Sequence, residues 1–206
     1  MIDTKALRQK ILDLAIRGKL VPQDPDDEPA SVLLERIRQQ KQQMVKDGKL
    51  KAKDIKNDTI IFVSEDNLHY EKFADGSVKC IEDEIPFDLP EGWAWVRLVS
   101  LIEAFITGPF GSALHKSDYV ADGIPLINPM NITNGKVIPI DKMQVSPETA
   151  ERLSSFKVAP SDIVIARRGD MGRCAVVQPA QKGWLCGTGS FILRFPAVLC
   201  SEYFAV

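Results

Sequence analysis

From residue 93 onward, the chain is a series of short apolar runs that turn-forming residues separate. The runs are rich in Val, Ile and Phe, and each is too short for a helix of ordinary length. Gly, Pro, Asn and Ser between them favour turns. This spacing predicts a set of strands in a compact β-rich domain. The expected strands are WAWVRL (93–98), EAFITG (103–108), IPLIN (124–128), KVIPI (136–140), DIVIAR (162–167), CAVVQ (174–178) and SFILRF (190–195).

One segment within this part has the signals of a helix start. Ser146 can cap a helix, Pro147 fits its first turn, and Glu148 places a negative charge where the helix dipole favours one. The helix is expected to extend to Leu153. Strands interrupted by a short helix make the expected fold class α+β.

The N-terminal part of the chain has helical periodicity instead. Leu7, Ile11 and Leu14 recur at i, i+4 and i+7, which places them on one face of a helix. The Asp3-Thr4 pair can cap the start of this helix, and Gly18 fits its C-terminal end. The sequence therefore predicts an amphipathic helix before residue 18.

A second amphipathic helix is expected after the acidic, proline-rich connector PQDPDDEP (22–29). Leu33 and Ile37 mark its apolar side, and Gly48 marks its end. Two short helices of this kind cannot bury both apolar faces by themselves. We expect them to pack on each other and on a further surface, in this chain or in a partner.

The segment between the helices and the strands is charged at first and then hairpin-like. Asp75-Gly76 suits a tight turn, which predicts a hairpin over residues 69–81. Because the chain stops soon after a strand, the β-rich domain is expected to be incomplete at its C-terminal end. The predicted organisation is a helical segment over 1–48, a linker with a hairpin over 49–85, and a β-rich domain over 86–206.

Charge gives no early indication of a nucleic-acid partner. The formal net charge is -2 at pH 7, whereas nucleic-acid-binding proteins usually have a basic surface. A local excess of basic residues occurs over residues 160–195, where Asp162 and Asp170 are the acids. The basic residues there are Arg167, Arg168, Arg173, Lys182 and Arg194.

The cysteines and the apolar runs bear on the compartment. Cys80, Cys174, Cys186 and Cys200 include no C-x-x-C pair, so a structural zinc site is not expected. No apolar run approaches the roughly 20 residues that cross a bilayer, and the N-terminus has no apolar signal segment. The expectation is a cytoplasmic protein with reduced thiols and no membrane partner.

The residues give little support to catalysis. His69 and His115 are the only histidines, and neither lies in a metal-binding pattern such as H-E-x-x-H. Asp162 and Asp170 lack the lysine that a metal-dependent nuclease site would need beside them. Residues 128–131 (Asn-Pro-Met-Asn) resemble the Asn-Pro-Pro-Tyr loop of adenine methyltransferases, but they lack the aromatic residue that would stack on a flipped base.

Three loops combine glycine with hydrogen-bond donors or cations. Thr107–Ser112 precedes His115 and Lys116, Arg167–Arg173 carries three arginines, and Gly187–Ser190 contains small residues. Glycines let backbone amides approach a phosphate closely, and arginine can bind either a phosphate or a guanine edge. Solvated hairpin turns are the alternative. Three such loops in one domain favour binding, but the physical argument alone leaves the ligand open.

Longer motifs occur in the order found in one known family. They are LRQKILDLAIRGKLVPQDPDDEPASVLLERIRQQK (7–41), IPFDLPEGWAWVRL (85–98), GPFGSALHKSDY, DGIPLINPMNI, DIVIARRGDMGRCAVV and LCGTGSFILR. The motif over 7–41 resembles the helical segment of type I restriction-modification specificity (S) subunits, including the Gly-Lys-Leu-Val-Pro-Gln and Glu-Pro-Ala-x-x-Leu-Leu signatures. The motif over 85–98 resembles the entry to a target recognition domain of that family, and the remaining motifs are similar to the body of such a domain.

The resemblance implies a DNA-recognition protein that does no chemistry itself. An S subunit of this family reads a split target with two recognition domains, and this chain departs from the pattern by holding one. Modification (M) subunits dock on the helices, bind S-adenosylmethionine and methylate adenine. Restriction (R) subunits add translocation and cleavage that use ATP and Mg. The resemblance thus implies no cofactor, metal ion or catalytic residue on this chain.

The same resemblance assigns expected contacts to named residues. The rival hypotheses are a nuclease or methyltransferase domain and a protein-protein adaptor. The helices are expected to contact the M subunits through Leu7, Ile11, Leu14, Leu33 and Ile37. The loops are expected to contact double-stranded DNA through Gly108, Phe110, Gly111, Ser112, His115, Lys116, Arg167, Arg168, Asp170, Arg173, Thr188 and Ser190.

Overall fold

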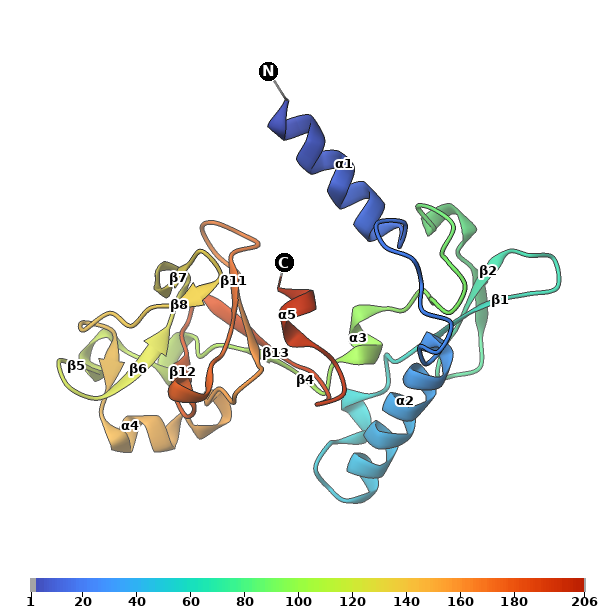
Figure 1. Cartoon of the computed structure of the whole chain (residues 1–206). Helices are drawn as coiled ribbons and strands as arrows, with labels where there is room; N and C mark the ends of the chain where they lie inside the picture. Colours follow the sequence, from blue (N-terminus) through green and yellow to red (C-terminus); the bar gives the residue numbers. More distant parts are fainter. Residues whose placement is uncertain (1–2, 206) are drawn as a thin grey trace. The chain divides into compact units, whose positions relative to one another are not determined.

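The computed structural model describes residues 3–205, which form two compact units (Figure 1). The first unit ends at Leu101 and the second begins at Ile102. Helices and strands both occur, so the predicted α+β class is confirmed. Residues 86–101 pack within the first unit, and the domain start at residue 86 stays a prediction.

The first helix, α1 (Thr4–Ile16), begins and ends as its sequence predicts. The Asp3 carboxylate accepts hydrogen bonds from the backbone N–H of Lys5 and of Ala6, both at 3.0 Å. Gly18 has a φ of +63°, the left-handed conformation that commonly ends a helix. None of the thirteen described residues of α1 is buried, so its apolar face is open here, and the surface on which it packs stays a prediction.

The second helix, α2 (Ala30–Lys46), does bury one face, against α3 (Leu98–Leu101). Ile37 is 1% exposed. The buried Lys41 ammonium donates to the carbonyl oxygens of Val99 and Ser100 at 3.4 and 3.2 Å, and it pairs with Asp58 at 2.6 Å. A buried lysine is tolerated because its charge is paired and hydrogen-bonded. The helix expected to pack on α1 is therefore anchored on α3.

A three-stranded antiparallel sheet completes the first unit, in the order β1-β2-β3. The predicted hairpin is confirmed, because Tyr70 pairs with Cys80 and Lys72 with Val78 around a turn at Gly76, whose φ is +85°. The edge strand β1 has no counterpart among the predictions. The strands are β1 (Ile60–Val63), β2 (His69–Lys72) and β3 (Val78–Cys80).

The prediction of a strand over residues 93–98 is wrong, because its side chains each find a separate partner. Trp93 donates through Nε1 to the Gln23 side chain at 2.7 Å. The ring of Trp95 packs edge-on against Phe87, with 5.2 Å between ring centroids. Residues 93–97 carry no regular structure in the described chain, and Leu98 begins α3. β-like composition alone does not form a strand without a neighbouring strand to pair with.

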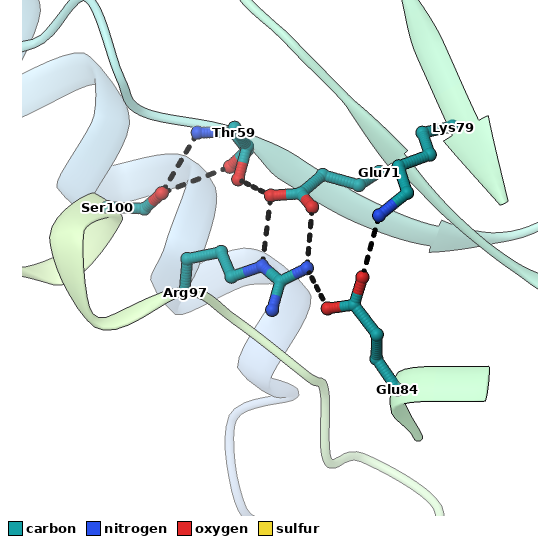
Figure 2. A network of polar contacts seen from close by, with 6 residues as sticks. All are labelled: Thr59, Glu71, Lys79, Glu84, Arg97 and Ser100. Atoms are coloured by element: carbon teal, nitrogen blue, oxygen red, sulfur yellow. Dashed lines mark hydrogen bonds and ion pairs between the residues drawn. The ribbon is translucent and has the colours of Figure 1, made fainter. Parts of the chain in front are cut away.

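A polar network holds the segment before α3 against the sheet (Figure 2). The Arg97 guanidinium donates to both oxygens of Glu71, at 3.0 and 2.7 Å, and to Glu84 at 2.6 Å. Glu71 is 4% exposed and also accepts from the Thr59 hydroxyl at 2.6 Å. These bonds lower the pKa of Glu71, chiefly through Arg97, and they raise the pKa of Arg97.

The second unit contains two four-stranded sheets and a two-stranded ribbon. One sheet is antiparallel, in the order β11 (Cys174–Val176), β10 (Ile163–Ala166), β13 (Ser190–Arg194), β4 (Ala104–Thr107). The other has the order β12 (Leu185–Cys186), β6 (Ile124–Ile127), β9 (Gln144–Val145), β5 (Tyr119–Val120). The ribbon pairs β7 (Ile132–Thr133) with β8 (Lys136–Val137).

The helices of the second unit are short. The predicted helix is confirmed as α4 (Pro147–Arg152), whose first turn is capped by the Ser146 hydroxyl accepting from the Thr149 N–H at 3.2 Å. Near the C-terminal end lies α5 (Ser201–Phe204). Within residues 3–205, the single 3-10 turns are Ala52–Asp54, Glu82–Glu84, Gly111–Ala113, Lys116–Asp118, Pro129–Asn131, Ser154–Phe156 and Pro179–Gln181.

The core of the second unit fixes the direction in which its loops leave. Strands β6 and β12 are parallel neighbours, so both end at the same edge of their sheet. Side chains from these strands contribute to both apolar clusters of the core. One cluster contains Ile127, Ile132, Val137, Val158, Val164, Ala175, Val177, Cys186 and Ile192, and the other contains Leu126, Val145, Ala150, Leu153 and Leu185.

Arg194 belongs to the fold and not to the basic surface with which the sequence groups it. Its guanidinium binds both oxygens of Asp162, at 2.8 and 2.7 Å, and Asp162 is 1% exposed. The same carboxylate accepts from the Ala159 N–H at 2.7 Å. This hydrogen-bonded pair raises the pKa of Arg194 and ties β10 to β13.

Candidate functional site

The Gly187 loop (187–190) follows β12 and lies against the Asn128 turn (128–131), which follows β6. The Gly189 N–H donates to the Asn128 side-chain oxygen at 3.3 Å, and the Gly187 N–H donates to the carbonyl of Ile127 at 2.9 Å. A Cβ at Gly187 would lie 2.3 Å from that same side-chain oxygen. A larger residue at this position would displace the Asn128 side chain.

The Gly108 loop (107–112) approaches the Gly187 loop from β4. The Gly108 N–H donates to the Ser190 carbonyl at 3.0 Å. A Cβ at Gly108 would lie 1.9 Å from the Gly187 carbonyl oxygen, which is far inside van der Waals contact. Glycine at position 108 therefore lets the two backbones touch.

The arginine loop (167–173) joins β10 to β11 and contacts the Gly187 loop from the other neighbouring strand. The Arg167 N–H donates to the Gly189 carbonyl at 2.9 Å, and Arg167 Nε donates to the Thr188 carbonyl, also at 2.9 Å. The Arg167 guanidinium lies 5.8 Å from the centroid of the Phe191 ring. This arginine is thus partly committed to holding the loops together.

Arg173 braces the arginine loop against the Asn128 turn. Its Nη1 donates at 3.3 Å to the carbonyl of Pro129, within that turn, and at 3.2 Å to the carbonyl of Ile132, directly after it. Its Nη2 pairs with Asp170 at 2.6 Å. The predicted contact residue Arg173 therefore has an internal positioning role in this conformation.

The Asn128 turn is the part of the site to which sequence reasoning assigned no contact residue, although the turn lies within the motif DGIPLINPMNI. Asn131 is 1% exposed, accepts from the Asn128 N–H at 3.0 Å and donates to the Ile138 carbonyl at 3.0 Å. The signal in the sequence is an Asn on each side of the Pro-Met pair, since Asn side chains readily stabilise turns. All three predicted loops meet directly or through one another at this turn.

The predicted DNA contacts differ in their exposure. Gly108 and Ser190 are buried, because close backbone contacts enclose them, and they support the loops without being open to a ligand. Arg167, Arg173 and Thr188 are half-buried. No side-chain hydrogen bond or ion pair of Arg168 is found within residues 3–205, and Arg168 is exposed. The other exposed positions are Phe110, Gly111, Ser112, His115, Lys116 and Asp170.

The segment that carries Ser112, His115 and Lys116 is anchored separately, by Arg152 of α4. Arg152 donates to the Ala113 carbonyl at 2.7 Å and to the Asp118 carboxylate at 3.2 Å. Asp118 in turn accepts from the His115 N–H at 2.8 Å. In the described part of the chain, no hydrogen bond joins this segment to the arginine loop.

The residues expected to contact M subunits are also divided by exposure. Leu7 and Ile11 of α1 are 50% and 43% exposed. Leu14 and Leu33 are half-buried. Ile37 is buried inside the first unit, so only the α1 part of the predicted surface is open.

No group of three or more His, Cys, Asp or Glu side chains within residues 3–205 could hold a metal ion. Burial raises the pKa of the Cys186 thiol to about 12, which keeps it protonated and unreactive at neutral pH. Over the same range, no helix has the length and apolar character to cross a membrane.

Relatives among known proteins agree with the motifs. No family model matches the chain. The specificity subunit of the type I restriction enzyme EcoAI from Escherichia coli is 37% identical over 161 residues, which is 78% of this chain. By sequence, the chain is similar to type I specificity subunits over most of its length. Another relative, the EcoEI specificity subunit of the same species, is 48% identical over 94 residues, or 46% of this chain. The chain spans 23% and 12% of the length of these two subunits.

Two solved structures are also similar to this chain. The HsdS subunit from Thermoanaerobacter tengcongensis has 22% identity and a TM-score of 0.44, over 58% of this chain and 27% of that one. A chain from a structure describing complex assembly and conformational transition of the type I R-M system has 17% identity and a TM-score of 0.44. That match covers 100% of this chain and 41% of the other.

Proposed function

We propose that the second unit is a DNA target recognition domain and that the chain selects a DNA sequence without performing chemistry. The observation that carries this proposal is the meeting of the Gly108, arginine and Gly187 loops at the Asn128 turn. A rigid support of this kind fixes exposed side chains for recognition. Kinship with type I specificity subunits supplies duplex DNA as the ligand.

Arg168 is the best candidate in the loops for reading a base. The Arg168 guanidinium is exposed and unpaired among the described residues. Arg167 and Arg173, at the two ends of the arginine loop, hold that loop in place. A guanidinium can donate two hydrogen bonds to the O6 and N7 atoms of guanine in the major groove. Lys116, which is exposed and lies on a different segment, suits a phosphate contact instead.

The partners of the chain follow from the same proposal. M subunits, which bind S-adenosylmethionine, would dock on the helical segment and use the open apolar face around Leu7 and Ile11. R subunits, which use ATP and Mg, would join that complex, and all of these proteins would act in the cytoplasm. The chain would direct adenine methylation and restriction while holding no cofactor itself.

Selection from a randomised DNA duplex pool tests the proposed function. The 206-residue chain is expected to enrich one short sequence at low salt. Binding should be weak, because one half-site offers few contacts. If repeated rounds enrich no sequence, recognition by this chain is refuted. Cleavage or methyl transfer by the isolated chain would instead favour a catalytic domain.

Arg168→Ala should weaken binding to the enriched duplex by about 1–3 kcal/mol and relax the preference at one base pair. The reason is loss of two hydrogen bonds that only the correct base can accept. Fluorescence anisotropy with single-base variants of the duplex measures both effects. Unchanged affinity and unchanged preference would remove Arg168 from the recognition surface.

Lys116→Ala should weaken binding to all duplexes alike, because a phosphate contact carries no sequence information. Loss of one such contact should reduce the slope of log affinity against log salt concentration by about 1. The measurement is a salt titration with the enriched duplex and a scrambled one. A sequence-dependent loss would contradict the assignment to a phosphate.

A further inference from the structure

Besides Phe110, two methionines stand open to solvent on the loops of the candidate site. Met171 of the arginine loop is 75% exposed, and Met130 of the Asn128 turn is 57% exposed. Single exposed apolar residues are common on protein surfaces, so it is the position of these two, on the loops that meet at the Asn128 turn, that indicates a role. Neither methionine belongs to the set of contacts that the sequence motifs indicate.

The structure holds both methionines firmly, because Arg173 connects the two turns that carry them. Arg173 binds Asp170, the residue before Met171, at 2.6 Å. It also donates to the carbonyl of Pro129, the residue before Met130, at 3.3 Å. Gly169 and Gly172, with φ of +73° and +89°, bend the chain on either side of Met171. The backbone is thus fixed while the side chains remain open.

We propose that Met130 and Met171 determine specificity by packing on the 5-methyl group of thymine in the major groove. The thymine methyl is the apolar group that a duplex displays there, and apolar side chains recognise it. Methionine suits this role because its unbranched thioether adapts to the surface that it meets. This inference rests on the proposed function, and it adds thymine to the bases that the site reads.

Replacing thymine by deoxyuridine tests the inference, since the exchange removes one methyl group and keeps every hydrogen-bonding group. The probe is the duplex enriched by the 206-residue chain, with each thymine replaced singly. We expect at least one replacement to weaken wild-type binding about fourfold, the effect of one buried methyl group.

Matched variants assign the lost contact to the methionines. Met171→Gln and Met130→Gln keep the side-chain length but make its end polar, so at least one of them should bind the thymine and uracil duplexes equally. Met171→Leu and Met130→Leu keep an apolar end and should retain the preference. Val198→Gln is the control, because Val198 is 45% exposed but lies outside the loops.

The outcomes separate the two proposals. If the wild-type chain enriches a sequence but binds thymine and uracil duplexes equally, the methionine inference is overturned and the proposed function stands. The same holds if both Gln variants keep the methyl preference. If the Gln variants lose affinity but removal of the thymine methyl group has no effect, the methionines contact the DNA in another way, such as insertion between stacked base pairs. The inference then also fails. Enrichment of no sequence overturns both proposals.

Discussion

Gly108→Ala is expected to destabilise the second unit by about 4 kcal/mol or more, or to prevent its folding. The new Cβ would lie 1.9 Å from the Gly187 carbonyl oxygen and 3.1 Å from that of Ser190. Both obstacles are backbone atoms, so no side-chain rotation relieves the overlap. The hydrogen bond from Gly108 to Ser190 that joins the two loops would break as well. Urea unfolding followed by circular dichroism measures the loss.

Gly111→Ala provides the matched control within the same loop. Its backbone has a positive φ, +59°, but a Cβ there meets nothing within 4 Å. Only the conformational strain remains, so the expected cost is about 1 kcal/mol. Equal losses for the two variants would show that strain, and not contact between the backbones, controls the Gly108 position.

The longer strands of the second unit were predictable because each appears in the sequence as a run of apolar residues. β4, β10 and β13 are apolar runs; Val164 of β10 and Ile192 of β13 are buried in the core, and Ile106 of β4 packs against it. The two-residue strands β5 and β12 carry too little periodicity to be recognised. Their pairing is decided by distant segments, as when Leu185 pairs with Leu126.

The candidate site was predictable as three loops but not as an arrangement of side chains. Glycine and arginine in loops indicate binding, and the structure brings the three loops together. Which arginine remains open depends on carbonyl groups that are distant in sequence, such as those of Pro129 and Thr188. Residue type cannot distinguish Arg168, which is exposed, from Arg173, which braces the turn.

Arg97→Met is expected to destabilise the first unit by about 3 kcal/mol, because it leaves the Glu71 carboxylate buried without its ion-pair partner. The value is at the lower end for a broken buried pair, since 37% of the Arg97 side chain is exposed. Lys79→Met is the control. Lys79 pairs with Glu84 in the same network, but 61% of its side chain is exposed, so a much smaller effect is expected (Figure 2).

The same variant should change how stability depends on pH. Arg97 lowers the pKa of Glu71 below its ordinary 4.5 in the folded chain. A lowered folded pKa gives stabilisation that is complete above about pH 4.5 and is lost as the pH falls through the folded value. Wild-type stability should therefore drop on acidification below about pH 4.5. In Arg97→Met this drop should shrink, because protonation would then relieve an unpaired buried charge. Urea unfolding of both proteins at about pH 7, 5 and 3 measures the difference, and an identical decline in the two would exclude the Arg97–Glu71 pair as its source.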